Sequence, residues 1–167
     1  MNMRSILIKG IIIFIISVVP IGLFVIDMDP YQFFKEDDIY LSQERYQIAG
    51  LARNKSYNSI IVGTSMVENF LDSEVSEKLN SKTIKLPINA SYVTEQGMII
   101  DMAIKHNNIK RVIWNIDYRC LDIEYGEYYE KEIEFPYYMY DEKFYNDWKY
   151  VINHSNLYLS VKKLLYK

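Results

Sequence analysis

Cysteine and histidine are almost absent from this chain of 167 residues. Cys120 is the single cysteine, which excludes an internal disulfide and a metal site made of several thiolates. The two histidines, His106 and His154, are too few for a histidine-rich metal site. We therefore expect the protein to hold no metal and to need no cofactor.

One long segment lacks charge altogether. Residues 10–26 form a run of 17 uncharged residues rich in Ile, Val and Phe. That length is close to the shortest that crosses a bilayer, about 17–25 residues. Arg4 and Lys9 precede the run, and Asp27 and Asp29 follow it. The positive-inside rule predicts that residues 1–9 are cytoplasmic and that the chain after Asp27 lies outside the membrane.

A cleaved signal peptide is the main alternative to an uncleaved signal anchor. The apolar core of a signal peptide is usually about 7–15 residues long and ends in a small-x-small cleavage site. Residues 25–30, Val-Ile-Asp-Met-Asp-Pro, offer no such site, so the sequence favours the anchor. A buried core helix is disfavoured because the run has no polar face.

Positive charge is in short supply as well. The whole chain has 19 basic and 22 acidic residues, a formal charge of −3. Without residues 1–26, 17 basic and 22 acidic side chains remain, which gives −5. Nucleic acid binding needs clustered positive charge, so we expect no nucleic acid partner.

The rest of the chain predicts an α/β fold, a three-layer parallel sheet flanked by helices, over residues 58–167. Residues 27–57 form a juxtamembrane segment with an expected helix at 41–53. The expected strands are 59–63, 83–86 and 111–117, and the expected helices are 68–79, 92–106 and 157–167. Strands and helices that alternate with short links favour parallel strands covered by helices.

The carboxyl ends of parallel strands meet at one edge of a sheet, where ligands bind in such folds. Three segments should therefore converge there: Gly63–Ser65, residues 87–91 and Asn115–Asp117. Asn115 and Asp117 close a strand that we expect to be fully buried, which favours a polar site beside them. The alternative is that Asp117 turns the chain into the next segment.

Ser65 follows a strand and a glycine, and it precedes an expected helix. A nucleophilic serine often sits at such a turn, because unpaired helix N–H groups can stabilise an oxyanion. The alternative is that Thr64 or Ser65 simply caps the helix.

Nine tyrosines lie between Tyr118 and Tyr150, with acidic residues interleaved. Tyrosine joins an apolar ring to a polar tip, so this segment suits a protein or glycan contact surface. The alternative is that the rings cover the sheet or pack a helical cap.

Four blocks of sequence resemble the SGNH/GDSL hydrolase superfamily, most closely its membrane-anchored cell-envelope members in Gram-positive bacteria. The likeness runs from about residue 59 to residue 153. The blocks are Gly63-Thr64-Ser65-Met66 with Glu68-Asn69-Phe70, Asn89–Gln96, Trp114-Asn115-Ile116-Asp117-Tyr118, and Phe135–Asp141 with Asn146-Asp147. The resemblance implies a flavodoxin-like sheet. Only three strands are evident, fewer than the family usually has, so the domain is expected to be incomplete: truncated, split or degenerate.

The resemblance also implies roles for individual residues. Ser65 matches the nucleophile, with Gly63 beside it, and Asn115 matches an oxyanion donor. The block with Asn89 lacks the family's glycine, so the backbone of Ala90 or Ser91 takes the place of the second donor. Asn115 and Asp117 are separated by one residue, whereas the family often has Asn and Asp adjacent.

The family's base is a histidine in an Asp-x-x-His motif, which this chain does not contain. His106 is expected at the opposite pole of the domain from Ser65, and His154 is the remaining candidate. A serine without a base is a weak nucleophile.

The sequence thus favours an SGNH-like esterase or acyltransferase-type domain that acts on O-acyl groups of an envelope glycan or another acyl-carrying polymer, inactive or truncated as the chain stands. The alternative is a non-catalytic, membrane-tethered binding or assembly module with a protein partner at Tyr118–Tyr150. A nucleotide-binding protein is disfavoured, because residues 63–65 lack a glycine-rich phosphate loop and its lysine.

Overall fold

The structure is a computed structural model that describes residues 3–41, 43–121 and 135–166. The chain divides into two compact units, and each is described here by itself. Tyr31–Glu142 form the sheet-containing unit, and Met1–Pro30 form the second unit together with Lys143–Lys167. This division differs from the expected single domain over residues 58–167, because residues 143–167 belong with the apolar helix.

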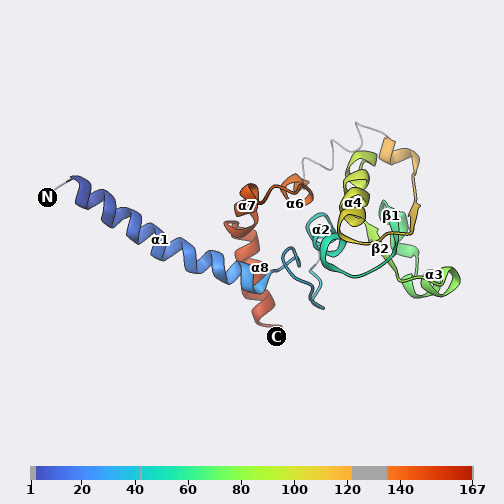
Figure 1. The fold of residues 1–167 in the computed structure, drawn as a ribbon, viewed down its shortest axis with the longest axis horizontal. Helices are drawn as coiled ribbons and strands as arrows, with labels where there is room; N and C mark the ends of the chain where they lie inside the picture. Colours follow the sequence, from blue (N-terminus) through green and yellow to red (C-terminus); the bar gives the residue numbers. More distant parts are fainter. Residues whose placement is uncertain (1–2, 42, 122–134, 167) are drawn as a thin grey trace. The chain divides into compact units, whose positions relative to one another are not determined.

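The sheet-containing unit places short helices around a small sheet (Figure 1). In chain order its elements are α2 (Glu44–Asn54), β1 (Ser59–Gly63), the 3-10 helix η1 (Ser65–Asn69), α3 (Asp72–Leu79), β2 (Thr83–Pro87), α4 (Val93–His106), β3 (Arg111–Trp114), the 3-10 helix η2 (Tyr118–Leu121) and α6 (Tyr137–Tyr140).

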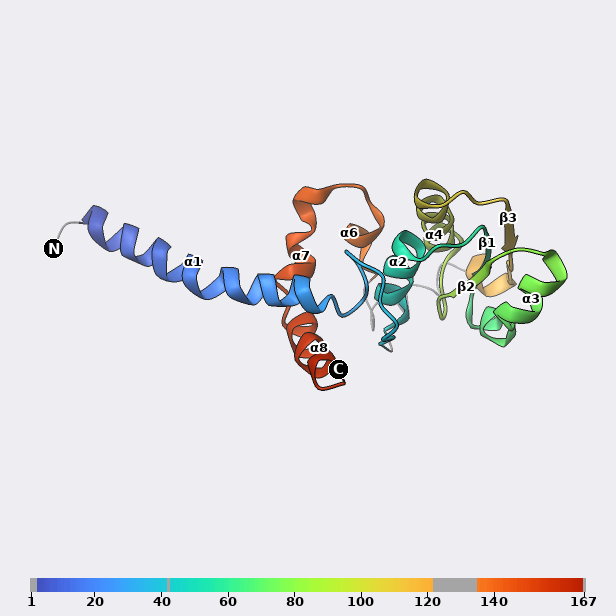
Figure 2. The same cartoon turned by 60° about the horizontal axis from the view of Figure 1, so that its bottom comes forward.

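The three strands form a parallel sheet in the order β2-β1-β3. All five residues of β1 are buried, as expected for a central strand rich in branched apolar side chains. Helices α2 and α4 pack against each other, α2 also against β2 and α4 against β1 (Figure 2). The α/β class and the parallel sheet flanked by helices are thus confirmed.

The expectation that the third strand is fully buried is wrong. β3 lies at the edge of the sheet, and its four residues are all exposed. It also ends at Trp114, three residues earlier than expected, so Asn115 and Asp117 lie in the segment that follows it. The sequence pattern did not reveal this, because an apolar strand reads the same at an edge as in the centre.

The expected helix at 68–79 is two elements. A single 3-10 turn, η1, follows β1, and the chain is extended at Phe70 and Leu71 before α3 begins. Lys85 Nζ donates to the carbonyls of Glu68 and Phe70 at 2.8 and 2.9 Å, which satisfies two acceptors that a continuous helix would have bonded internally.

Helix α2 begins three residues later than expected and is held firmly to its surroundings. A Cβ atom at Gly50 would lie 2.0 Å from the carbonyl oxygen of Tyr31, so only glycine permits this close approach. Arg45 Nη2 lies 3.4 Å from Glu95 Oε2 of α4, and both side chains are buried. The Tyr140 hydroxyl donates to the Arg45 carbonyl oxygen at 2.7 Å, which attaches α6 to α2.

The second unit contains α1 (Met3–Met28), the 3-10 helix η3 (Phe144–Asn146), α7 (Trp148–Val151) and α8 (His154–Leu164). Helix α1 is long and apolar enough to cross a membrane, and 17% of its most apolar stretch is buried. A helix in a protein core would be mostly buried. Helix α8 begins three residues before the expected start, where the Asn153 side chain accepts from the amides of Ser155 and Asn156.

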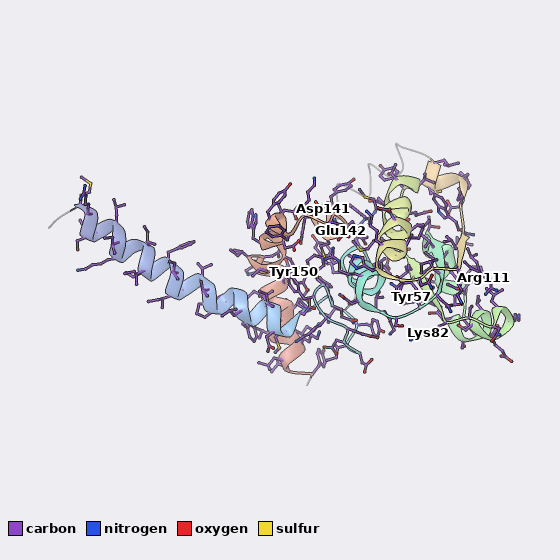
Figure 3. All side chains as sticks on the ribbon, in the orientation of Figure 1. Tyr57, Lys82, Arg111, Asp141, Glu142 and Tyr150 are labelled. Carbon is purple, nitrogen blue, oxygen red and sulfur yellow. The ribbon has the colours of Figure 1, made fainter. Side chains whose placement is uncertain are left out.

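A buried polar cluster joins the end of α1 to α7 and α8. Asp29 is fully buried and has a positive φ of 42°. Its Oδ1 accepts a hydrogen bond from the Tyr150 hydroxyl at 2.7 Å, and its carbonyl oxygen accepts one from Lys163 Nζ at 2.8 Å. Tyr150 and Lys163 are themselves fully buried (Figure 3 labels Tyr150). These bonds hold residues 143–167 to the apolar helix.

Candidate functional site

The carboxyl ends of the three strands converge as their connectivity predicts. Gly63 pairs with Pro87, and Val62 pairs with Trp114. Just beyond the strands, the Ile88 amide donates to the Gly63 carbonyl at 3.0 Å, and the Asn115 amide donates to the Val62 carbonyl at 2.8 Å. The three segments expected to form the site therefore lie side by side at one edge of the sheet.

Ser65 is exposed at this edge and begins η1. Its hydroxyl makes no hydrogen bond to any residue in the described part of the chain. The segment after it is a five-residue 3-10 helix, not the α-helix that the elbow pattern predicted. A helix dipole at Ser65 is therefore minimal, and any oxyanion stabilisation must come from individual N–H groups.

Thr64 does not cap the following helix. It is 6% exposed, and its hydroxyl donates to Asp117 Oδ2 at 2.5 Å, across the edge of the sheet. No side-chain bond from Thr64 to the start of η1 is present. The capping interpretation of Thr64 is thus wrong, because the carboxylate of Asp117 is the stronger acceptor for this hydroxyl.

Asp117 faces the site and also turns the chain, so both of its interpretations hold. Oδ2 accepts from Thr64, while Oδ1 accepts from the Cys120 amide at 3.2 Å. The Cys120 thiol donates to the Asp117 carbonyl oxygen at 2.9 Å. Burial raises the pKa of the Cys120 thiol, so this cysteine is a structural donor and not a reactive thiolate.

Asn115 lies against Gly63. A Cβ atom at Gly63 would stand 2.8 Å from the Asn115 carbonyl oxygen and 3.0 Å from its Cβ. Asn115 Oδ1 is buried and has no hydrogen-bond partner within the described ranges. Buried polar atoms in folded proteins usually have a hydrogen-bond partner. The Asn115 side-chain oxygen can therefore still accept a hydrogen bond beside the end of β1, where Ser65 lies.

The three residues of the turn at 89–91 differ in their hydrogen-bond partners. Asn89 donates from its amide and from Nδ2 to the Glu44 carboxylate, each at 2.8 Å, so it fastens the turn to α2. The Ser91 amide donates to the Ile88 carbonyl, and the Ser91 hydroxyl accepts from Gln96 Nε2. Ala90 has a φ of 50°, and its N–H makes no hydrogen bond to the described residues.

Gln96 is a link that the sequence pattern did not reveal. It is fully buried, donates to Ser91 Oγ at 3.0 Å and accepts from Trp114 Nε1 at 2.6 Å. It therefore connects the 89–91 turn to β3. Nothing in the spacing of apolar residues along 92–106 indicates these partners.

Neither histidine belongs to this cluster. His106 ends α4 and its Nε2 lies 3.1 Å from Glu142 Oε1, near the amino ends of the strands. His154 is exposed at the start of α8, in the other compact unit. In the part of the chain that the structure describes, no group of His, Cys, Asp or Glu side chains is arranged to hold a metal ion.

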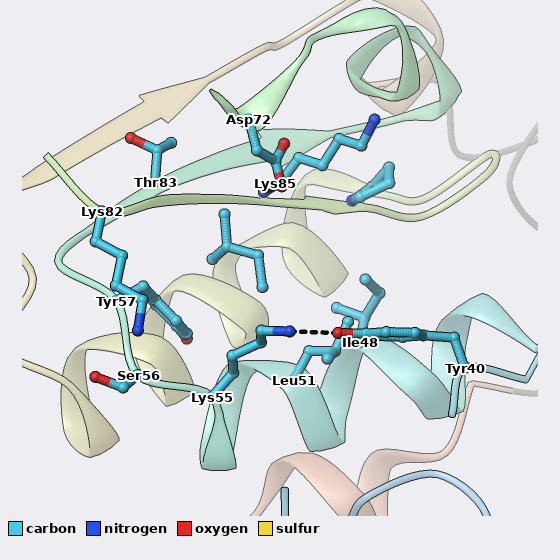
Figure 4. Close-up of a pocket in the computed structure, with 12 residues that line it drawn as sticks. Tyr40, Ile48, Leu51, Lys55, Ser56, Tyr57, Asp72, Lys82, Thr83 and Lys85 are labelled. Carbon is cyan, nitrogen blue, oxygen red and sulfur yellow. Dashed lines mark hydrogen bonds between the residues drawn. The ribbon is translucent and has the colours of Figure 1, made fainter. Parts of the chain in front are cut away.

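A separate cavity of about 340 Å³ lies between α2 and β2 (Figure 4). Its walls include the apolar side chains of Ile48, Leu51 and Ile84. Lys55 and Lys82 also line it, and Lys55 Nζ hydrogen-bonds the Tyr40 hydroxyl. That bond raises the pKa of Lys55, so the lysine stays charged. Lys82 Nζ has no partner among the described side chains.

The tyrosine-rich segment is only partly described, since residues 122–134 lie outside the described ranges. Its described tyrosines differ in burial, and Tyr138 is intermediate. Tyr140 and Tyr150 are buried and hydrogen-bonded, which fits the packing alternative, whereas Tyr118, Tyr137 and Tyr145 are exposed.

Comparison with known proteins finds no counterpart for this arrangement. No protein-family model matches the chain, and neither a curated protein nor a solved structure matches it.

Proposed function

We propose that the sheet-containing unit is an SGNH-like domain of the esterase or acyltransferase type, which holds an O-acyl group at Ser65. The observation that carries the proposal is the convergence of Ser65, Ala90 and Asn115 at the strand ends. Each of these residues has hydrogen-bonding capacity that the described part of the chain leaves unused. An acyl carbonyl bound there would meet a hydroxyl nucleophile and two donors.

Different observations support Ala90 and Asn115 as the two oxyanion donors. Ala90 takes the left-handed conformation that glycine favours, which suits the position where the resembling family has glycine. Its N–H is uncommitted, whereas that of Ser91 is bonded to Ile88, so Ala90 is the preferred backbone donor. The buried unpartnered atom of Asn115 is Oδ1, an acceptor that cannot bond an oxyanion, so Asn115 would serve as a donor only through Nδ2.

The proposed site lacks a base within the sheet-containing unit. Asp117 is engaged with Thr64 and Cys120, and His106 lies at the far end of the sheet. Ser65 would then be acylated slowly, because nothing takes its proton. We accordingly propose that the chain by itself turns over esters poorly and needs a base from His154 or from another chain.

A serine-directed fluorophosphonate probe tests this proposal on the full chain. Labelling of the wild type that disappears in Ser65→Ala supports it. Ser73→Ala is the matched control, because Ser73 is an exposed serine on α3. Equal labelling of the wild type and Ser65→Ala, or no labelling at all, rejects acyl transfer at this residue.

The proposed location is the cell membrane, with α1 as an uncleaved anchor and the sheet-containing unit on the outer side, facing envelope glycans or other acyl-carrying polymers. The packing of α7 and α8 against α1 supports retention of α1, because its removal would expose the surfaces that these two helices bury against it. Protease added to intact protoplasts should remove an epitope from the carboxyl terminus; protection of that epitope would contradict the orientation.

The cavity beside α2 favours a second candidate, a non-catalytic binding module. Apolar walls lined also by three lysines and one carboxylate suit an anion that carries a short alkyl chain; the charged lining residues are Lys55, Lys82, Lys85 and Asp72. Calorimetric titration of the chain in nanodiscs with hexyl phosphate tests this, with hexyltrimethylammonium as the cationic control. Binding of the phosphate should weaken in Lys82→Gln and persist in Lys78→Gln, since Lys78 lies outside the cavity. Equal binding of the two amphiphiles would contradict it.

A further inference from the structure

Helix α8 has its polar and apolar sides reversed relative to a helix of a water-soluble domain. Its buried residues Asn156, Ser160 and Lys163 are all polar. They are spaced four and three residues apart, so they share one face. A soluble domain would normally bury the apolar face of such a helix and expose the polar one.

The opposite face of α8, continued by Leu165 just after the helix, is exposed and carries apolar side chains beside the polar His154. Tyr158, Val161 and Leu165 are 62%, 46% and 80% exposed, and they follow Asn156 by two, five and nine residues. At about 100° per residue those offsets place them on the side of the helix away from Asn156. Further exposed apolar or aromatic residues of the same unit are Phe144, Tyr145, Trp148, Ile152, Leu164 and Tyr166.

The buried polar face has a specific purpose in this unit. Lys163 donates to the Asp29 carbonyl, Asn156 Nδ2 donates to the Tyr150 carbonyl at 2.8 Å, and the Tyr150 hydroxyl donates to Asp29. Polar groups bonded to one another in this way can be withdrawn from water, and they leave the outward face free to be apolar.

Helix α8 contacts the end of α1, the helix that is long and apolar enough to cross a membrane. Helix α7 also contacts α1, and Gly22 makes room for it, because a Cβ atom there would lie 2.9 Å from Val151 Cγ1. A groove lined by Val18, Ile21 and Leu157 runs along the same junction. Figure 2 shows α8 running across α1 near its carboxyl end. The contact lies in the carboxyl-terminal half of α1, which brings α8 close to one membrane surface when α1 spans the bilayer.

We infer that residues 144–166 form a second membrane contact, in which α8 lies in the interface between lipid headgroups and acyl chains with Tyr158, Val161 and Leu165 facing the lipid. Exposed tyrosine and tryptophan side chains are typical of that depth, and the exposed Lys149 and Lys162 suit anionic headgroups. This inference depends on α1 spanning the membrane and is independent of any chemistry at Ser65.

Trp148 reports directly on this contact, because the chain has only two tryptophans and the other, Trp114, belongs to the sheet-containing unit. The full chain carrying Trp114→Phe is reconstituted into vesicles of phosphatidylcholine and phosphatidylglycerol. Trp148 emission should shift to shorter wavelength, be quenched strongly by lipids brominated near the headgroup, and resist aqueous iodide. The reciprocal variant, Trp148→Phe, should leave Trp114 insensitive to the brominated lipids.

A reporter on α8 itself makes the test independent of α7. Tyr158→Trp, in a chain with both native tryptophans replaced by phenylalanine, should give the same quenching by brominated lipids. Adding Val161→Glu and Leu165→Glu should abolish that quenching and admit iodide. Val161→Leu with Leu165→Ile is the matched apolar control and should retain it.

Two results would overturn the inference. One is quenching of Trp148 and of the position-158 reporter by iodide but not by brominated lipids. The other is protection of these tryptophans from iodide that decreases as the protein-to-lipid ratio is lowered. In that case a second copy of the chain, and not lipid, covers the apolar face.

Discussion

The Thr64 hydroxyl donates to Asp117 Oδ2 at 2.5 Å, although 53 residues separate the two in the chain. This bond connects the end of β1 to the segment after β3 and closes the edge of the sheet beside Ser65. It also commits the carboxylate to Thr64 and to the Cys120 amide, so Asp117 supports the site rather than activating Ser65.

Replacing Thr64 by valine should destabilise the protein by about 1–2 kcal/mol, because the partly buried Asp117 carboxylate loses a hydrogen bond while the size of the side chain at position 64 is kept. Urea unfolding of the sheet-containing unit, followed by circular dichroism, measures the loss. The neighbouring Ser65→Ala is the control and should change the free energy of unfolding by less than about 0.5 kcal/mol, since its exposed hydroxyl has no bond to lose. Similar losses of stability in Thr64→Val and Ser65→Ala would contradict this prediction.

Gly63→Ala should cost about 1–3 kcal/mol. The added methyl group would stand 2.7 Å from Val67 Cγ2 and 2.8 Å from the Asn115 carbonyl oxygen, and that backbone oxygen cannot move without disturbing the pairing of β1 with β3. Gly97→Ala, within α4, meets no atom within 4 Å and should instead stabilise the protein by about 0.5–1 kcal/mol. Thermal unfolding distinguishes the two variants. If Gly63→Ala left the unfolding temperature unchanged, the contacts of Gly63 with Val67 and Asn115 would be less close than the structure shows.

The sheet-containing unit should lose stability in alkaline solution. Burial raises the pKa of Tyr57, and burial near Glu95 raises that of Tyr140, above the ordinary tyrosine value. The unfolded chain then releases these protons at a lower pH than the folded protein does. Unfolding is consequently favoured as the pH rises from about 10 towards the folded-state pKa values, and unaffected below that range.

Spectrophotometric titration of tyrosinate checks this alkaline prediction. Exposed tyrosines should titrate first, followed by a cooperative step at which the buried ones ionise as the unit unfolds. In Tyr57→Phe the pH dependence of stability should be shallower, although the variant loses the bond to the Ala52 carbonyl. If the pH dependence of stability were unchanged in Tyr57→Phe, ionisable groups other than Tyr57 would cause the alkaline loss of stability.

Tyr150→Phe should weaken the attachment of α7 and α8 to α1 by about 1–3 kcal/mol, because Asp29 Oδ1 loses a buried donor. Tryptic cleavage after Lys162 in the full chain should then become faster. Tyr158→Phe is the matched control, since the Tyr158 side chain is 62% exposed and makes no described hydrogen bond. Equal cleavage of the two variants would show that the Asp29 cluster does not hold α8 in place.

Local patterns in the sequence were sufficient to predict most strands and helices, and to predict that the carboxyl ends of the strands meet at one edge of the sheet. Ser59–Gly63 and residues 83–86 read as strands, and residues 92–106 as a helix, because the period of apolar side chains differs between the two structures. Short links between them then required parallel strands and a shared edge. The apolar run was equally plain from its composition, and it forms one long helix, α1.

The partners of polar side chains and the neighbours of each surface were decided only by the tertiary structure. The sequence offered Thr64 as a cap, Gln96 only as the end of a block of family resemblance and residues 157–167 only as a helix. Their bonds to Asp117, to Ser91 and Trp114, and to Asp29 join residues far apart in the chain, and such pairings depend on geometry in three dimensions. For the same reason the sequence indicated a helix at residues 157–167, but not that the polar face of α8 is the buried one.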